Sequence, residues 1–121
     1  MVEDKKRQAL ELRKQGYNCA QCVAMVYDAS LEATVAALGT GVAATGNICG
    51  AANAMAIIAG REAYVGPMEK QALYGRVARL IEKFKERNCG HVNCCDLRRP
   101  GRKPCTELIT DAIEILDEEG Y

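Results

Sequence analysis

The sequence predicts an all-α protein, a compact bundle of five to six helices with no significant sheet. Apolar residues recur at three- and four-residue steps over long stretches, which is the period of an amphipathic helix. No stretch shows the alternating pattern that favours a strand. The 121 residues are 49% hydrophobic and 26% charged, close to a globular average, and we find no linker and no repeat. We therefore expect one domain over residues 1–121.

Helix starts and stops are marked by glycine, asparagine and proline. Gly16 ends a first helix, and Asn18 caps a second one, with Gln21 three residues on as the other half of a capping box. Pro104 introduces the last helix. The region 88–104 is irregular and basic. The expected helices span residues 3–15, 18–29, 31–38, 48–59, 67–87 and 105–119.

Two of these helices carry a clear apolar stripe, and a third is unusually rich in small residues. We expect the helix 48–59 to permit close approach by a neighbouring helix, a cofactor or a second copy of the chain in a homodimer. The other two stripes are expected to face the core. In the helix 67–87 the stripe is Met68, Ala72, Leu73, Val77, Leu80, Ile81 and Phe84, and in the last helix it is Leu108, Ile109, Ala112, Ile113 and Leu116.

Charge and aromatic content exclude several classes of function. Sixteen basic and sixteen acidic residues cancel, and the chain has no Trp and one Phe, so we expect no nucleic-acid binding. Glycine and asparagine interrupt the long apolar region 31–59, so we expect no membrane span. The charged N-terminal residues lack a following apolar segment, which is not typical of a secretory signal and favours a cytoplasmic protein.

Seven cysteines are the unusual feature of this chain, and an odd number in a reducing compartment does not favour a disulfide framework. Cys19, Cys49 and Cys105 each fall at the expected start of a helix. The N-terminus of a helix offers unpaired N–H groups and the positive end of the helix dipole, which stabilise a thiolate. We therefore expect these cysteines to do redox or metal chemistry.

The remaining cysteines are weaker candidates. Cys19 and Cys22 form a C-x-x-C pair, although Cys22 also fits a core position of an amphipathic helix. A lower-ranked set of metal ligands consists of Cys22, Cys89, Cys95 and the sole histidine, His91, for which an exposed loop position is the alternative.

Four segments resemble the C_GCAxxG_C_C family of redox-active proteins. They are Gly16-Tyr17-Asn18-Cys19-Ala20-Gln21, Gly46-Asn47-Ile48-Cys49-Gly50-Ala51, Gly90-His91-Val92-Asn93-Cys94 and Cys105. The resemblance implies a small helical redox protein whose signature cysteines are Cys19, Cys49, Cys94 and Cys105, with Cys95 as an alternative to Cys94. It places Gly50 beside the site. The closing glycine of the family motif is Ala54 here.

Three chemistries remain open for the four cysteines. They suit an iron–sulfur cluster used in electron transfer, because four thiolates hold such clusters. The alternative is a cofactor-free thiol–disulfide oxidoreductase or redox sensor, with Cys19 or Cys49 attacking and Cys94 or Cys105 resolving. A structural zinc site in the loop 89–105 is the third. We expect a redox partner protein, attracted by the basic stretch 98–103.

Overall fold

The computed structural model describes residues 1–99 and 103–121, and it confirms the all-α prediction. Within those residues the backbone forms helices joined by turns, without a strand. A single isolated antiparallel bridge joins Ile48 to Asn93. The α-helices are α1 Val2–Lys14, α2 Cys19–Met25, α3 Gly50–Ala63, α4 Lys70–Arg87, α5 Cys94–Leu97 and α6 Cys105–Glu118; the 3₁₀ turns are η1 Ala29–Leu31, η2 Ala36–Leu38 and η3 Pro67–Glu69.

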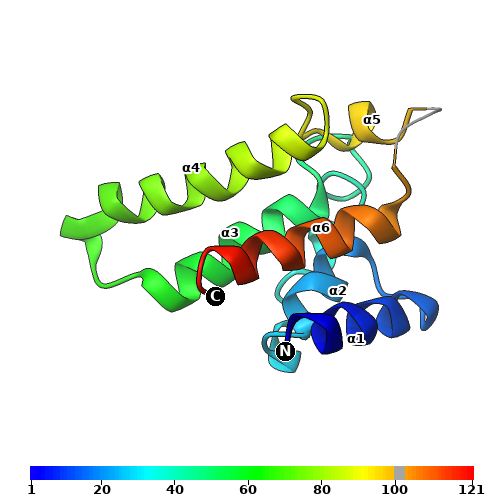
Figure 1. The fold of residues 1–121 in the computed structure, drawn as a ribbon, viewed down its shortest axis with the longest axis horizontal. Helices are drawn as coiled ribbons and strands as arrows, with labels where there is room; N and C mark the ends of the chain where they lie inside the picture. Colours follow the sequence, from blue (N-terminus) through cyan, green and yellow to red (C-terminus); the bar gives the residue numbers. More distant parts are fainter. Residues whose placement is uncertain (100–102) are drawn as a thin grey trace.

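Helices α3 and α6 form the centre of the molecule. Figure 1 shows α4 running beside α3 and α6, with α1 and α2 on the other side. The predicted inner face of α6 is confirmed, because Leu108, Ile109, Ala112, Ile113 and Leu116 are all buried. None of the helices in the described residues is long and apolar enough to cross a membrane.

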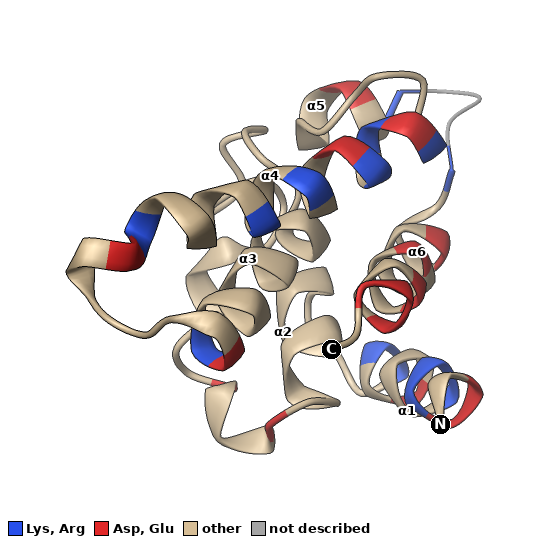
Figure 2. Ribbon diagram, turned by 60° about the vertical axis from the view of Figure 1, so that its left-hand side comes forward, with Lys and Arg blue, Asp and Glu red and all other residues tan. Residues whose placement is uncertain are grey.

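Charged side chains join the outer helices across the surface. Arg87 of α4 contacts three carboxylates of α6, those of Asp111, Glu114 and Glu118. Lys6 of α1 contacts the same Glu114. Figure 2 shows the basic residues along α4 opposite the acidic residues of α6. These ion pairs orient α1, α4 and α6 relative to one another, while the buried apolar residues supply most of the stabilisation.

Several predictions of local secondary structure are wrong. The α-helix expected over 31–38 is replaced by short 3₁₀ turns, and α2 ends at Met25 rather than near residue 29. Asp28 then caps η1 through a hydrogen bond from the Ser30 N–H. The short helix α5 lies inside the region expected to be irregular, of which residues 100–102 lie outside the described residues.

The apolar stripe expected in the helix 67–87 is buried only in its second half. Leu80 and Phe84 are buried, whereas Met68 and Ala72 are exposed and Leu73, Val77 and Ile81 are half-buried. Figure 1 shows the reason. The first half of α4, η3 and the end of α3 project beyond the other helices as a hairpin. Only α3 lies beside this half of α4, so one side of it is covered and the other is not.

The small residues of α3 are used inside the chain. Gly50, Ala51, Ala52 and Ala54 are all buried in the core formed with α2, α4 and α6. These four residues are therefore not available for a contact with a second copy, whereas Ala56 and Gly60 of the same helix are half-buried.

Candidate thiol site at the helix N-termini

The four signature cysteines each stand at the start of a helix. Cys19 is the first residue of α2, Cys49 is the residue that caps α3, Cys94 begins α5 and Cys105 begins α6. The predicted helix-start positions of Cys19, Cys49 and Cys105 are thus confirmed. The loop before α3, helix α5 and the start of α6 lie at one end of the molecule, away from the α3–α4 turn (Figure 1).

Local hydrogen bonds position Cys19 at the start of α2. The Asn18 side chain accepts from the Gln21 N–H at 2.9 Å, and the Gln21 side chain accepts from the Asn18 N–H at 3.1 Å. This is the predicted capping box. Asn18 also donates to the Ala36 carbonyl at 2.8 Å, which ties α2 to the loop that covers it.

A short backbone pairing fixes Cys49 beside Cys94. The Cys49 N–H donates to the Val92 carbonyl at 2.8 Å, and the Cys94 N–H donates to the Asn47 carbonyl at 2.7 Å. The bridge pairs Ile48 with Asn93. In each segment the next residue is a cysteine that stands at the start of a helix. Nothing in the local sequence pattern predicts this contact.

Cys19 and Cys49 are in direct contact through their sulfur atoms. The Cys49 thiol donates a hydrogen bond to the Cys19 sulfur, and this bond is the main reason that the pKa of Cys19 falls to about 6. Burial opposes the shift, while the N–H groups of Thr40, Ala51 and Ala20 also donate to the Cys19 sulfur and favour the thiolate. The same hydrogen bond raises the pKa of Cys49, as do its burial and the charge on Cys19. The pair therefore holds one negative charge and one proton.

Gly50 makes this contact possible. A Cβ atom at Gly50 would lie 2.7 Å from the Cys19 sulfur and 3.0 Å from the Leu38 carbonyl oxygen. Any side chain there displaces the sulfur from the N–H donors of α2 and α3. The predicted place of Gly50 beside the site is consistent with this geometry. Ala54, where the family motif has glycine, is fully buried in the core of α3.

A left-handed turn closes the site over Cys19. Residues 40–44 all have positive φ, including Thr40 at 53° and Val42 at 65°. A non-glycine residue in this conformation costs about 1–2 kcal/mol. The turn brings the Thr40 N–H to the Cys19 sulfur. Backbone strain at a reactive group is typical of functional sites.

Cys94 and Cys105 lie on the outer side of the pair. Burial raises the pKa of Cys94, and the charges of Cys19 and Cys105 raise it further, so both sulfurs lie within electrostatic reach. The Arg98 guanidinium donates a hydrogen bond to the Cys94 sulfur and opposes that shift. Cys49, Cys19 and Cys94 are all buried, with exposed fractions of 3%, 8% and 7%, and only Cys105 is half-buried.

The other candidate cysteines lie apart from this contact. Cys22 is fully buried, donates to the Tyr17 carbonyl at 3.6 Å, and has its pKa raised by burial to about 11. The C-x-x-C pair is therefore not the contacting pair. Cys89 is exposed and follows the end of α4. Cys95 is also exposed, and its Cβ lies close to Gly46. His91 lies 3.9 Å from the Asp96 carboxylate.

A single metal ion needs several ligand side chains around one centre, and a structural zinc ion needs four. Among residues 1–99 and 103–121, no three His, Cys, Asp or Glu side chains are placed so that they hold a metal ion together. The described residues thus do not fit a single-ion site, and the iron–sulfur and zinc assignments stay predictions.

Comparison with known proteins gives the same family as the sequence motifs. Residues 17–119 match the family described as "Putative redox-active protein (C_GCAxxG_C_C)". The chain belongs to this family. No curated protein and no solved structure matches the chain. The matched range includes Cys19, Cys49, Cys94 and Cys105.

Proposed function

We propose that this chain is a thiol–disulfide redox protein in which Cys19 and Cys49 form the inner redox pair. The observation that carries the proposal is the hydrogen bond between these two sulfurs, which come from the starts of separate helices. A thiolate already in contact with a second thiol is the arrangement that a reversible disulfide needs. The C-x-x-C pair does not offer it, because the Cys22 thiol donates to a backbone carbonyl instead.

Cys94 and Cys105 form the outer pair that exchanges with a partner. Cys105 is the residue that meets the partner disulfide, since it is half-buried, whereas Cys19, Cys49 and Cys94 are all buried. Exposed Arg98 and Arg99 lie in the segment that follows Cys94 and favour an acidic partner. Arg99 also pairs with Asp96 and Lys103 with Asp111. Arg102, the other cation of the predicted basic stretch, lies outside the described residues.

The electrons move in two exchange steps. A partner disulfide oxidises Cys94 and Cys105 to a disulfide and leaves as a dithiol, so two electrons pass to the partner. The Cys19 thiolate then attacks the Cys94 sulfur, and Cys105 leaves as a thiolate. Cys49 gives its proton to the Cys105 thiolate and attacks the Cys19 sulfur, and Cys94 leaves as a thiolate. The products are a Cys19–Cys49 disulfide, a Cys105 thiol and a Cys94 thiolate, ready for another partner.

Disulfide mapping in glutathione buffers of graded potential tests this function. We expect a Cys19–Cys49 disulfide in the oxidised protein, and its reversible loss in reducing buffer. The Cys49→Ser variant is expected to accumulate a Cys19–Cys94 disulfide, because the resolving thiol is missing. Cys22→Ser, in which a buried cysteine outside the pair is changed, is the matched control and leaves the pair intact. Cys19 and Cys49 that stay reduced at every potential contradict the proposal.

An iron–sulfur cluster is the second candidate. It is favoured by the number of N–H groups aimed at sulfur, from Thr40, Ala20 and Ala51 to Cys19 and from Ala51 and Ala52 to Cys49. Four cysteine ligands hold a [2Fe–2S] cluster, which supplies one-electron transfer when bound. Protein prepared without oxygen and carrying stoichiometric iron and sulfide, lost in Cys49→Ser and Cys94→Ser, overturns the thiol proposal in favour of this one.

A further inference from the structure

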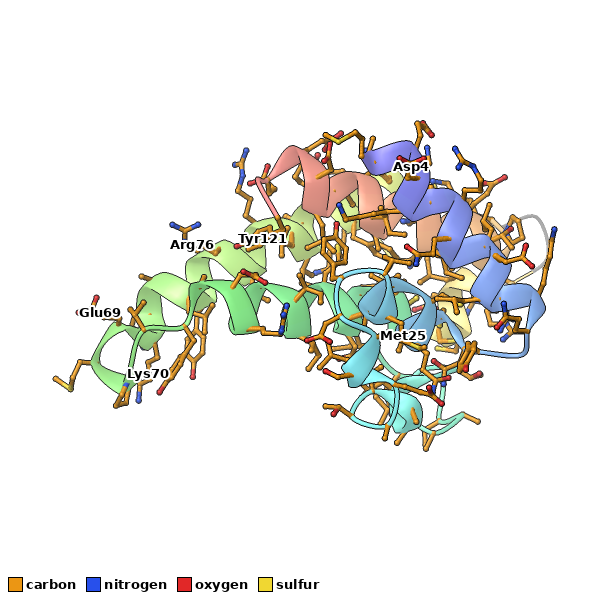
Figure 3. The ribbon with its side chains drawn as sticks, turned by 90° about the horizontal axis from the view of Figure 1, so that it is seen from below. Asp4, Met25, Glu69, Lys70, Arg76 and Tyr121 are labelled. Atoms are coloured by element: carbon orange, nitrogen blue, oxygen red, sulfur yellow. The ribbon has the colours of Figure 1, made fainter. Side chains whose placement is uncertain are left out.

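The projecting α3–α4 hairpin carries the largest group of exposed apolar residues in the described chain. Met68 is 91% exposed and Val65 is 77% exposed, and Tyr64 and Tyr74 are each more than half exposed. Exposed apolar residues that gather in one segment mark an interaction surface more often than scattered ones do. Figure 3 shows this hairpin extending alone, with Glu69 and Lys70 near its end.

A groove lies at the base of the same hairpin. It has a volume of about 520 Å³ and is lined by Val65 and Ala63 of the turn, by Arg76 of α4, and by Tyr27 and Tyr121 from the body, together with Glu62 and Gly120. The groove is thus mainly apolar, with a cation on the α4 side. Figure 3 shows Arg76 pointing away from the α4 ribbon, on the side where Tyr121 lies.

Three exposed charges on the hairpin, those of Glu69, Lys70 and Arg76, have no ion-pair partner among the described residues, and Figure 3 shows Lys70 on the other side of the ribbon from Arg76. Glu69 and Arg76 are both exposed, and neither takes part in the ion pairs that join the surface elsewhere. They are seven residues apart, which is about two turns and places them on the same side of the helix. Ala72 lies between them, and Gly75 has open space beside its Cα.

We infer that the hairpin is the contact surface of a homodimer, in which α4 packs antiparallel against α4 of a second copy. A twofold axis passing between Ala72 and Leu73 places Glu69 of each copy opposite Arg76 of the other. Met68, next to Glu69, then enters the groove beside Arg76 of the second copy. In a twofold symmetric interface the same surface of each copy must be complementary to itself. Here one surface carries both the projecting Met68 and the groove that receives it.

Charge complementarity selects a second copy as the occupant. One surface offers an unpaired carboxylate and an unpaired guanidinium at equal distances from the proposed axis, so two ion pairs form at once. Methionine fills irregular apolar spaces well because its side chain is unbranched and flexible. Ala72 and Gly75 let the two α4 backbones approach closely. Gly50, Ala51, Ala52 and Ala54 of α3, by contrast, are already buried in their own chain.

Charge reversal tests this inference independently of the cysteine chemistry. Sedimentation velocity is measured on the reduced full chain over a range of concentrations. We expect a dimer for the unchanged protein. Glu69→Arg and Arg76→Glu each set like charges against each other twice, so each is expected to weaken the dimer about 100-fold or more. The double variant Glu69→Arg with Arg76→Glu restores opposite charges and is expected to restore the dimer.

Control variants separate this interface from general effects of charge. Glu11→Arg reverses an exposed carboxylate on α1, outside the hairpin, and is expected to leave the dimer unchanged. Circular dichroism confirms that each variant keeps its helices. A protein that is monomeric at every concentration overturns the inference. So does a dimer that survives both single reversals, or a double variant that stays as weak as the single ones.

Discussion

The two ends of α3 differ in how tightly they are packed, since the N-terminal end is enclosed and the C-terminal end is open. At its N-terminal end, Cys49 is buried and Gly50 is packed tightly against α2 and the Leu38 carbonyl of η2, so even a methyl group at Gly50 does not fit. At its C-terminal end, Tyr64 and Val65 project with the start of α4 and are mainly exposed. Gly60, near that end, has nothing within 4 Å of the position a Cβ would take.

The difference shows that one helix serves two separate purposes. The closed end excludes water and supplies N–H groups to sulfur, which is what a stabilised thiolate needs. The open end leaves apolar surface for a contact outside the chain. The predictions below compare the two ends by changing matched residues at each, and they run from the largest expected effect to the smallest.

The largest expected effect is the difference in stability loss when an apolar residue is truncated in each half of α4. Phe84→Ala removes a fully buried ring and is expected to lower the free energy of unfolding by about 3–5 kcal/mol. Met68→Ala removes an exposed side chain and is expected to change it by no more than about 0.5 kcal/mol in the monomer. Urea unfolding at low protein concentration measures both. Equal losses contradict the exposure of the hairpin.

Adding a methyl group to α3 compares its two ends directly. Gly50→Ala meets the Cys19 sulfur and the Leu38 carbonyl, and we expect a loss of about 1–3 kcal/mol. Gly60→Ala meets nothing, and we expect a gain of about 0.5–1 kcal/mol from better helix propensity. Thermal unfolding of the reduced proteins gives both values. A neutral Gly50→Ala variant shows that the sulfur is not held against the backbone.

The pH dependence of Cys19 tests the closed end alone. Because the pKa of Cys19 is lowered to about 6, its alkylation by iodoacetamide is expected to rise with pH, with a midpoint near pH 6, and to level off once the thiol is fully ionised. Cys49→Ala removes the thiol that donates to Cys19, so the midpoint moves up toward the ordinary value of 9.0. Each unit of that rise lowers the thiolate fraction at neutral pH by up to about tenfold.

A serine at position 49 is the matched control for this shift. Cys49→Ser keeps a hydrogen-bond donor but has no sulfur, so the midpoint stays near the unchanged one while the disulfide is lost. Mass spectrometry of the peptide that contains Cys19 distinguishes it from the other cysteines. The same midpoint in the alanine and serine variants assigns the low pKa to the backbone N–H groups instead.

Removing the cation beside the outer pair has the smallest expected effect. Arg98 donates to the Cys94 sulfur and is exposed, so Arg98→Ala is expected to raise the pKa of Cys94 further and slow its alkylation a few-fold at most. Arg99→Ala removes a cation that pairs with Asp96 and serves as the control. Peptide mapping of Cys94 alkylation in low and high salt measures the change.

The sequence by itself determined the helical architecture and the beginnings of the helices. Asn18, Gln21 and Pro104 act on backbone groups within a few residues of themselves, so their effects are visible in the sequence. The same local information identified Cys19, Cys49 and Cys105 as helix-start cysteines. It also revealed the family motif, because the motif consists of short segments around those starts.

Only the tertiary structure decided which sulfurs meet and which apolar residues are covered. Cys19 contacts Cys49 rather than Cys22 because α2 and α3 pack together, and Cys94 comes beside Cys49 through the backbone pairing with residues 46–48. The apolar stripe of α4 is periodic along its whole length, but it is buried only where α6 accompanies it. Periodicity shows that a helix has an apolar side, whereas burial depends on whether another element extends far enough to cover it.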